Sequence, residues 1–293
     1  MPQYEYLTID VFTDQRFGGN PLAVFPDAAG LDQATMQALA AELNYSETTF
    51  VLPPSNPANS AHVRIFNRTA EMPFAGHPNV GTGFALARQG KAAGTLRFEE
   101  IAGLVEVRPL EIEGVIVGAE IDAPQSLTVM EAYTAAEIAA CLSLAPSQIV
   151  QDLHVPVRAS VGVDFVLVGV TNDALATAVP DVGAFRRLVN ARPELGGRLS
   201  VFLYVLDGND VRARMFAPLS GTWEDPATGS ANATLAALRL HLSGEETLAY
   251  QAVQGVEMGR ESRLSLRAWR DGQGVRASVG GRCVPMFAGR VTL

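Results

Sequence analysis

The sequence has no cluster of basic residues and no stretch in which aromatic residues alternate with lysine or arginine. Its 22 lysine and arginine residues are outnumbered by 31 acidic residues, which gives a formal net charge of -9. Such a composition argues against a surface that binds nucleic acid or an anionic membrane. An acidic protein that binds an anionic substrate must therefore do so locally, through helix N-termini or a few placed cations.

Long hydrophobic runs are also missing. No window approaches the roughly 20 apolar residues that a membrane-spanning helix needs, and the N-terminal MPQYEYLTIDVFTD lacks a cationic region followed by an apolar one. These absences predict a cytoplasmic protein with no membrane segment. With 293 residues, 48% of them hydrophobic, the chain is long enough for one large or two ordinary domains.

Cysteine is scarce, and histidine is scattered. Cys141 and Cys283 stand in neither a C-x-x-C pair nor the neighbourhood of a histidine, so we expect both to be buried free thiols. No H-E-x-x-H or similar grouping is present, and we predict no metal site and no cofactor. The four histidines are His62, His77, His154 and His241.

Two segments of the chain resemble each other. RIFNRTAEMPFAGHPNVGTGFALAR begins at Arg64, and RMFAPLSGTWEDPATGSANATLAALR begins at Arg214. Each opens with arginine, an aliphatic residue and phenylalanine, crosses a polar loop and reaches a His-Pro or Asp-Pro pair before a helical run rich in alanine and leucine. Such self-similarity predicts two halves built on one plan.

Short strands with alternating apolar residues flank each helical run. The pattern predicts an α+β fold of two pseudo-symmetric domains, each a mainly antiparallel curled sheet around a central apolar helix. Smaller helices are predicted over about residues 32–43 and within TAAEIAACLSL. Pro124 interrupts the strand pattern, so we place the domains at 1–124 and 125–293. The final strand, MFAGRVTL, is left free to pair with either half.

The segment WEDPATGS predicts how the second helical run begins. Asp225 is a favoured N-cap, and Pro226 suits the first turn of a helix. If the two halves face each other, the helix starts at Pro78 and Pro226 point at one cleft, and their free N–H groups form a site for a carboxylate. The alternative for Asp225 is that it only caps the helix.

Small residues near both helix starts have two interpretations. Gly76, Gly81 and Gly229 would let the backbone approach a ligand closely, while Thr82 and Ser230 could donate hydroxyl hydrogen bonds to it. The alternative is that the glycines only permit tight packing between helix and sheet.

Glu47, in ELNYSETTFVL, stands where the chain is predicted to pass from a helix into a strand. A carboxylate at the edge of an apolar pocket has a raised pKa and can both take and return a proton. The alternative is a solvated loop acid.

Four motifs carry a resemblance to a known family. GGNPLAVF, SETTFVLPP, FAGHPNVGT and EDPATGSANA run in this order from Gly18 to Ala233. Together they resemble the phenazine-biosynthesis isomerase family (PhzF-like), which is similar in fold to diaminopimelate epimerase and proline racemase. The resemblance implies an active site between two pseudo-symmetric α+β domains, and it implies a homodimer.

The resemblance also assigns roles to residues. It implies that Glu47 is the catalytic acid/base and that His77 and Asp225 complete the catalytic group. Substrate-binding roles fall on Ser230 and on two loop glycines, Gly76 and Gly229. Asn79 departs from the threonine of many relatives, a small change at the helix start.

Epimerases of this fold place a cysteine at each helix start, where this chain has His77 and Asp225. A two-thiol racemase is therefore disfavoured, and a single carboxylate implies a hydrogen shift rather than stereoinversion. We predict a cofactor-independent isomerase acting on a small cyclic or unsaturated carboxylic acid, without nucleic-acid or membrane partners.

Three rival functions differ in their expected chemistry. A non-catalytic protein would bind a small molecule in the same cleft. A hydrolase would use Ser46 or Ser230 with His77 and Asp225, but neither serine stands in a G-x-S-x-G elbow. A nicotinamide enzyme is the weakest rival, because GHPNVGTG lacks the G-x-G-x-x-G spacing.

Overall fold

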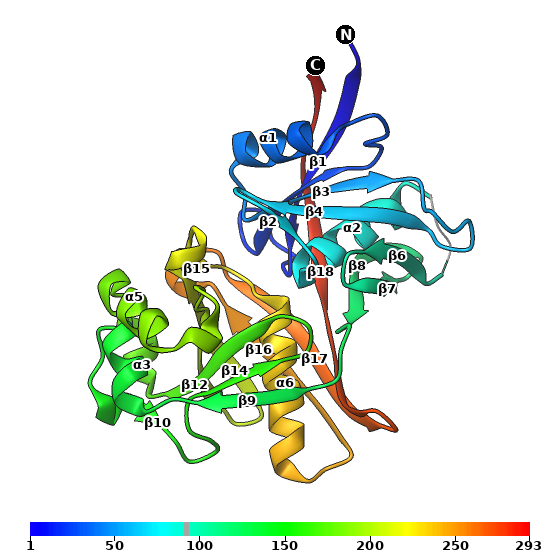
Figure 1. Cartoon of the computed structure of the whole chain (residues 1–293). Helices are drawn as coiled ribbons and strands as arrows, with labels where there is room; N and C mark the ends of the chain where they lie inside the picture. Colours follow the sequence, from blue (N-terminus) through cyan, green and yellow to red (C-terminus); the bar gives the residue numbers. More distant parts are fainter. Residues whose placement is uncertain (91–93) are drawn as a thin grey trace.

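The computed structural model describes residues 1–90 and 94–293 and shows two halves joined along one long strand (Figure 1). The first half contains the strands β1 (Gln3–Val11), β2 (Asn20–Phe25), β3 (Glu47–Leu52), β4 (Ala61–Asn67), β5 (Glu71–Met72), β6 (Leu96–Glu100), β7 (Gly103–Ile112) and β8 (Val115–Asp122) and the helices α1 (Gln33–Leu43) and α2 (Gly76–Arg88).

The second half is larger. It contains the strands β9 (Thr128–Ala132), β10 (Ile149–Val150), β11 (Val157–Ser160), β12 (Asp164–Val170), β13 (Val201–Asp207), β14 (Asp210–Ala217), β15 (Thr222–Asp225), β16 (Thr247–Gln254), β17 (Ser262–Asp271) and β18 (Gly274–Thr292). Its α-helices are α3 (Ala135–Cys141), α4 (Asn172–Thr177), α5 (Val182–Ala191) and α6 (Gly229–Ser243). Short 3-10 helices are formed by Pro146–Gln148, Pro193–Leu195, Pro218–Ser220 and Val256–Met258.

The strand pairings of the two halves follow the same order. In the first half β2 is parallel to β3, β3 is antiparallel to β4, β4 pairs with the short β5 and with the parallel β6, and β6 is antiparallel to β7. The second half repeats this series of pairings. There β12 is parallel to β13, β13 is antiparallel to β14, β14 pairs with the short β15 and with the parallel β16, and β16 is antiparallel to β17. The predicted α+β fold with two pseudo-symmetric halves is therefore confirmed.

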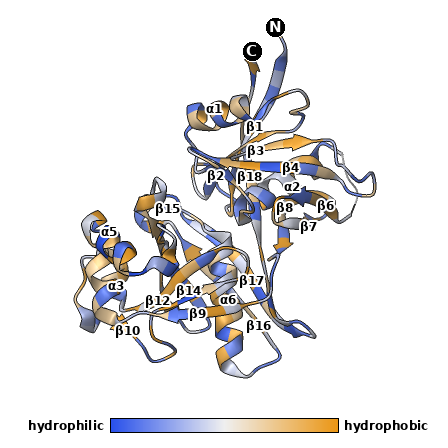
Figure 2. Ribbon diagram, in the orientation of Figure 1, coloured by the Kyte–Doolittle hydropathy of each residue, from blue (hydrophilic) through white to orange (hydrophobic). Residues whose placement is uncertain are grey.

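Each half wraps its sheet around one nearly all-buried helix. Residues 76–86 of α2 and residues 229–238 of α6 are buried. A helix that is apolar on every side must be surrounded, and the strands around it supply the inner face of the core. Hydrophobic colour predominates on β12 in Figure 2, and its Phe165 and Leu167 belong to the same core cluster as α6. Within residues 1–90 and 94–293, no helix has both the length and the apolar character to cross a membrane.

The smaller helices test the local predictions. The helix expected over residues 32–43 is α1, where Asp32 accepts a hydrogen bond from the Thr35 N–H at 2.7 Å and Asn44 closes the end with a left-handed φ of 56°. The helix in TAAEIAACLSL is α3. The helix α5 was not predicted, although its Phe185 and Leu188 lie on one buried face at helical spacing.

The last strand crosses from the second half to the first. Residues 274–280 of β18 pair with β17, and residues 283–292 pair antiparallel with β1, so that Thr292 lies opposite Gln3. MFAGRVTL thus pairs with the first half, and the two chain ends lie side by side (Figure 1). The division at residue 124 stays a prediction. It falls in the connection between β8 and β9, beside the bond from the Ala123 N–H to the Ala277 carbonyl.

Both cysteines are buried and free, as predicted. Burial raises the pKa of Cys141 to about 12 and raises the pKa of Cys283 further. Neither thiol therefore forms a thiolate readily near neutral pH.

Candidate active site

The two central helices meet at their N-termini. The helix α2 begins at Gly76 and α6 begins at Gly229. A Cβ atom on Gly76 would lie 3.0 Å from the backbone nitrogen of Ser230 and 3.2 Å from the carbonyl carbon of Gly229. The backbones are thus in contact, and the residue with no Cβ permits it. The N–H groups of both helix starts converge where the two halves meet.

The predicted positions of the helix starts were wrong by a few residues. Pro78 lies inside the first turn of α2, where its missing N–H would have had no helical partner. Pro226 lies outside α6, packed so closely on Gly255 that a Cβ there would come within 2.6 Å of the Pro226 oxygen. Proline also favours extended backbone in the preceding residue, so Asp225 ends β15 and is not the N-cap.

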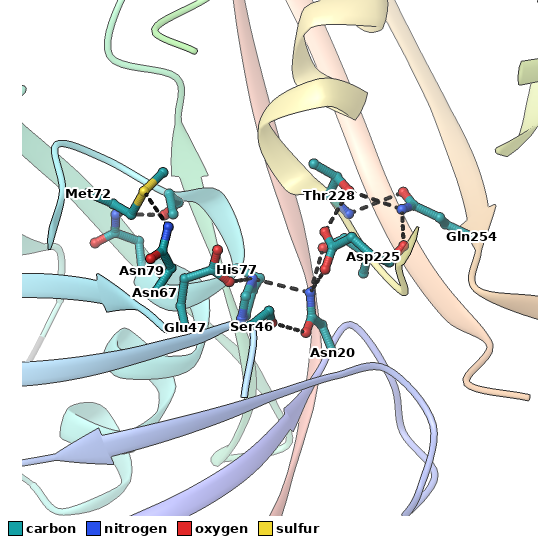
Figure 3. Close-up of polar contacts among 12 residues, drawn as sticks. Asn20, Ser46, Glu47, Asn67, Met72, His77, Asn79, Asp225, Thr228 and Gln254 are labelled. Carbon is teal, nitrogen blue, oxygen red and sulfur yellow. Dashed lines mark hydrogen bonds and ion pairs between the residues drawn. The ribbon is translucent and has the colours of Figure 1, made fainter. Parts of the chain in front are cut away.

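The Asp225 side chain is instead held by hydrogen bonds from both halves of the molecule. Asn20 Nδ2 donates to Oδ1 at 2.9 Å, and the Thr228 hydroxyl donates to Oδ2 at 2.6 Å. Gln254 fixes the backbone by donating to the Asp225 carbonyl at 2.7 Å. Burial raises the pKa of Asp225 to about 6, opposed by the Thr228 and Asn20 hydrogen bonds. Figure 3 shows this network on the side of the cluster that belongs to the second half.

Glu47 is the first residue of β3, and its side chain is 19% exposed. Burial, and then the negative charge of Asp225, raise the pKa of Glu47 to about 8. This is the direction expected of a carboxyl group at the edge of an apolar pocket. Both its protonated and its ionised form are therefore accessible near neutral pH.

His77 lies between the two acids. Its Nδ1 atom is 3.5 Å from Glu47 Oε2 and 3.3 Å from Asn20 Nδ2 (Figure 3). Burial lowers the pKa of His77 to about 3, so the ring is neutral. Asn20 Nδ2 has two N–H groups and donates them to Asp225 Oδ1 and the Ala227 carbonyl, so the role of His77 Nδ1 follows the ring tautomer. Nε2 is buried and makes no hydrogen bond to any residue that the structure describes.

Asn20 is the site residue that the sequence analysis missed. It begins β2, is fully buried, and links Ser46 in the first half to Asp225 and Ala227 in the second. The Ser46 hydroxyl donates to Asn20 Oδ1 at 2.8 Å, while Nδ2 also donates to the Ala227 carbonyl at 3.0 Å. The available signal was the motif GGNPLAVF, whose only polar side chain is that of Asn20.

The small residues near the helix starts divide into two groups. Ser230 is buried in the first turn of α6, and its hydroxyl makes no hydrogen bond within residues 1–90 and 94–293, so it is free to bind a ligand. Thr82 is bonded to the Thr49 hydroxyl at 2.8 Å and does not reach a ligand. A Cβ atom on Gly81 would lie 2.5 Å from Leu22, so the packing interpretation holds for this glycine.

The arrangement also bears on the rival functions. The Ser46 hydroxyl is engaged by Asn20, and in the described part of the chain neither Ser46 nor Ser230 is hydrogen-bonded to His77. A serine–histidine pair, which the hydrolase requires, is therefore not assembled. Among the described residues, no group of three or more histidine, cysteine, aspartate or glutamate side chains is placed to hold a metal ion.

The protein has two pseudo-symmetric α+β halves and a cluster of carboxyl groups where their central helices meet. These features define a protein of the epimerase fold. A hydroxyproline epimerase from Agrobacterium vitis shares this fold with a TM-score of 0.67 and 14% sequence identity, over 99% of this chain and 93% of the other. A phenazine biosynthesis protein of the PhzF family from Bacillus anthracis is more similar, with a TM-score of 0.88 and 24% identity over 100% of both chains.

The family follows from the sequence matches. The family model for phenazine biosynthesis-like proteins (PhzC-PhzF) matches residues 9–289. An uncharacterized isomerase of Mesorhizobium japonicum is 38% identical over 99% of both chains. The trans-2,3-dihydro-3-hydroxyanthranilate isomerase of Pseudomonas aeruginosa is 34% identical over 99% of this chain and 100% of that one. This chain therefore belongs to the phenazine biosynthesis-like family, and it is an isomerase of that family.

Proposed function

We propose that the protein moves a proton within a small cyclic or unsaturated carboxylic acid, without a cofactor, and that Glu47 takes and returns the proton. The observation that carries this proposal is a partly exposed carboxyl group with a pKa raised to about 8, placed where two helix N-termini meet. The Pseudomonas aeruginosa relative supports it, because its name describes an isomerase of a cyclic carboxylic acid.

The proposed reaction uses each part of the cluster. Ionised Glu47 removes a proton from one carbon of the substrate, the double-bond electrons shift, and the same carboxyl group returns the proton to another carbon. In the tautomer that carries its proton on Nε2, neutral His77 donates a hydrogen bond to the charge that develops during the transfer. The Ser230 hydroxyl and the N–H groups of Gly76 and Gly229 hold the oxygen atoms of the substrate.

Asp225 orients the substrate from the second half of the molecule. Its pKa is raised to about 6, so it ionises before Glu47 as the pH rises. Its negative charge then favours the protonated form of Glu47, which keeps the proton available for return. The resemblance to the family further suggests a homodimer, which light scattering of the purified protein tests.

The test is proton NMR in D2O of a panel of dihydroaromatic and unsaturated carboxylic acids with the wild-type protein and with Glu47→Gln in parallel. Deuterium that enters a carbon position, or a double bond that shifts, only with the wild type supports the proposal and identifies a substrate. Equal spectra for the two proteins, despite binding of a panel compound, would contradict it and favour a non-catalytic binding protein.

The pH dependence of the reaction follows from the shifted pKa values. The base form of Glu47 accumulates as pH rises through about 8, so the initial rate of deuterium incorporation should rise up to that pH. His77, with a pKa lowered to about 3, contributes no change in the same range. Rates measured from about pH 5 to about pH 9 check this. A midpoint near 4.5, the ordinary value for glutamate, would contradict it.

A further inference from the structure

A cation stands at the edge of the carboxyl cluster. Arg68 begins the turn between β4 and β5, directly after Asn67. Asn67 lies opposite Glu47 in the β3–β4 pairing, and Figure 3 shows the two side chains next to each other. Arg68 therefore follows directly after the β4 residue that pairs with Glu47.

The turn that carries Arg68 is rigid. Asn67 Oδ1 accepts hydrogen bonds from the N–H groups of Thr69 and Ala70, both at 2.8 Å. The Asn67 N–H donates to the Ala70 carbonyl at 2.9 Å. These bonds close the turn on itself and fix the point from which the Arg68 side chain extends.

The guanidinium group of Arg68 is held by neutral oxygen atoms from both halves. Its Nε donates to Asn44 Oδ1 at 2.9 Å and to the Asn44 carbonyl at 3.2 Å, and Nη1 donates to the Gly221 carbonyl at 3.5 Å. Within the described part of the chain, Nη2 makes no hydrogen bond and no carboxylate lies within ion-pair distance of Arg68.

The internal repeat shows that Arg68 differs from the two arginines that open the repeated segments. Arg64 and Arg214, which open the two repeats, each bind a glutamate of the neighbouring short strand through two nitrogen atoms. Four residues further on, the first repeat has Arg68, whereas the second repeat has Pro218. The site therefore receives this cation from one half alone, and no carboxylate of the described residues forms an ion pair with it.

The charge of Arg68 acts on the site. It lowers the pKa of both Glu47 and Asp225, against the larger effect of burial on each. The same positive potential favours any anion that enters the cleft. The N–H groups of the helix starts also favour an anion, but they can donate to a neutral carbonyl oxygen as well.

We propose that Arg68 selects an anionic substrate, by pairing its free Nη2 face with the carboxylate group of the molecule that occupies the cleft. Asn44 and Gly221 hold the guanidinium group in place from the two halves. The helix starts and Ser230 then orient the substrate, while Arg68 distinguishes an acid from its neutral amide. The inference rests on the proposed function in that it takes the occupant of the cleft to be the substrate.

The experiment compares two probes of similar shape, the anionic 2-aminobenzoate and the neutral 2-aminobenzamide. Both probes are aromatic and cannot undergo the proposed hydrogen shift. The acid is anthranilate, from which the compound in the name of the Pseudomonas aeruginosa relative is derived. Dissociation constants are measured by NMR titration at neutral pH with the full-length wild type, Arg68→Gln, Arg68→Lys and Arg290→Gln. Arg290 pairs with Glu5 and Gln3 near the chain ends, and its replacement removes the same charge there.

The wild type should bind the acid about tenfold more tightly than the amide, since a charge-assisted hydrogen bond is roughly twice as strong as a neutral one. Arg68→Gln should lose most of this preference while keeping the affinity for the amide. Arg68→Lys should keep part of it, and Arg290→Gln should match the wild type.

Three outcomes overturn the inference. One is a wild type that does not prefer the acid, including one that binds neither probe. Another is an Arg68→Gln variant that keeps the preference. The third is an equal loss of affinity for both probes, which indicates a structural role. The deuterium experiment is separate: acid selection through Arg68 without proton exchange refutes only the proposed function, and exchange with an unchanged preference in Arg68→Gln refutes only this inference.

Discussion

Replacing Glu47 with glutamine is expected to lower kcat by about 10²- to 10⁴-fold, the usual contribution of a positioned acid/base. Glutamine has nearly the same size and keeps a side-chain oxygen, but it cannot accept and return a proton. The partly exposed position of Glu47, with a pKa raised to about 8, makes its ionisation the property that is lost. The rate of deuterium incorporation into a substrate found in the acid panel measures the effect.

Glu42 offers a matched control. It is exposed on α1, five residues before Glu47, and Glu42→Gln makes the same chemical change outside the cluster. Glu42→Gln should turn over substrate at the wild-type rate, and Glu47→Gln should still bind it. An unchanged kcat in Glu47→Gln would remove Glu47 from its proposed role as the acid/base.

Periodic features explain how much of the fold could be predicted. The alanine and leucine run of α6 is apolar on every side, so a surrounding sheet follows from its sequence. The helix α1 carries its own N-cap, Asp32, and was predicted with the correct end and with a start one residue early. The repeat that begins at Arg64 and Arg214 made the pseudo-symmetry visible before any contact was known.

Long-range contacts explain what could not be predicted. Nothing local in MFAGRVTL determines that it pairs with β1, more than 270 residues earlier in the chain. The start of α6 moved from Pro226 to Gly229 because Gly255, distant in sequence, packs on the proline. The same holds for Arg68, whose guanidinium group reaches Gly221 only after the two halves have come together.

Asn20 is the clearest such case, and its replacement is the second prediction with a large expected effect. Asn20→Ala should lower kcat by about 100-fold, because His77 and Asp225 lose the side chain that fixes their relative position. It should also lower the free energy of unfolding by about 2 to 4 kcal/mol, since the buried Ser46 hydroxyl and the Ala227 carbonyl each lose a hydrogen-bond partner. Urea unfolding and steady-state kinetics measure the two effects.

Asn232 separates positioning from stability. It is as fully buried as Asn20, and its side chain donates to the Thr228 carbonyl at 3.0 Å and to Gln254 at 2.9 Å without bonding to Asp225 itself. Asn232→Ala should therefore lose a similar amount of stability with a much smaller loss of kcat.

The pH profile gives a second distinction, because a purely structural loss would not move it. The Asn20 hydrogen bond lowers the pKa of Asp225, so its removal should leave Asp225 protonated up to a higher pH. Because protonated Asp225 no longer raises the pKa of Glu47, the apparent pKa values of the two acids in the rate profile are expected to move toward each other. Equal losses of kcat in the two alanine variants, with an unshifted profile in Asn20→Ala, would reduce Asn20 to a packing residue. A shifted profile in Asn20→Ala alone would identify it as the residue that couples the two acids across the halves.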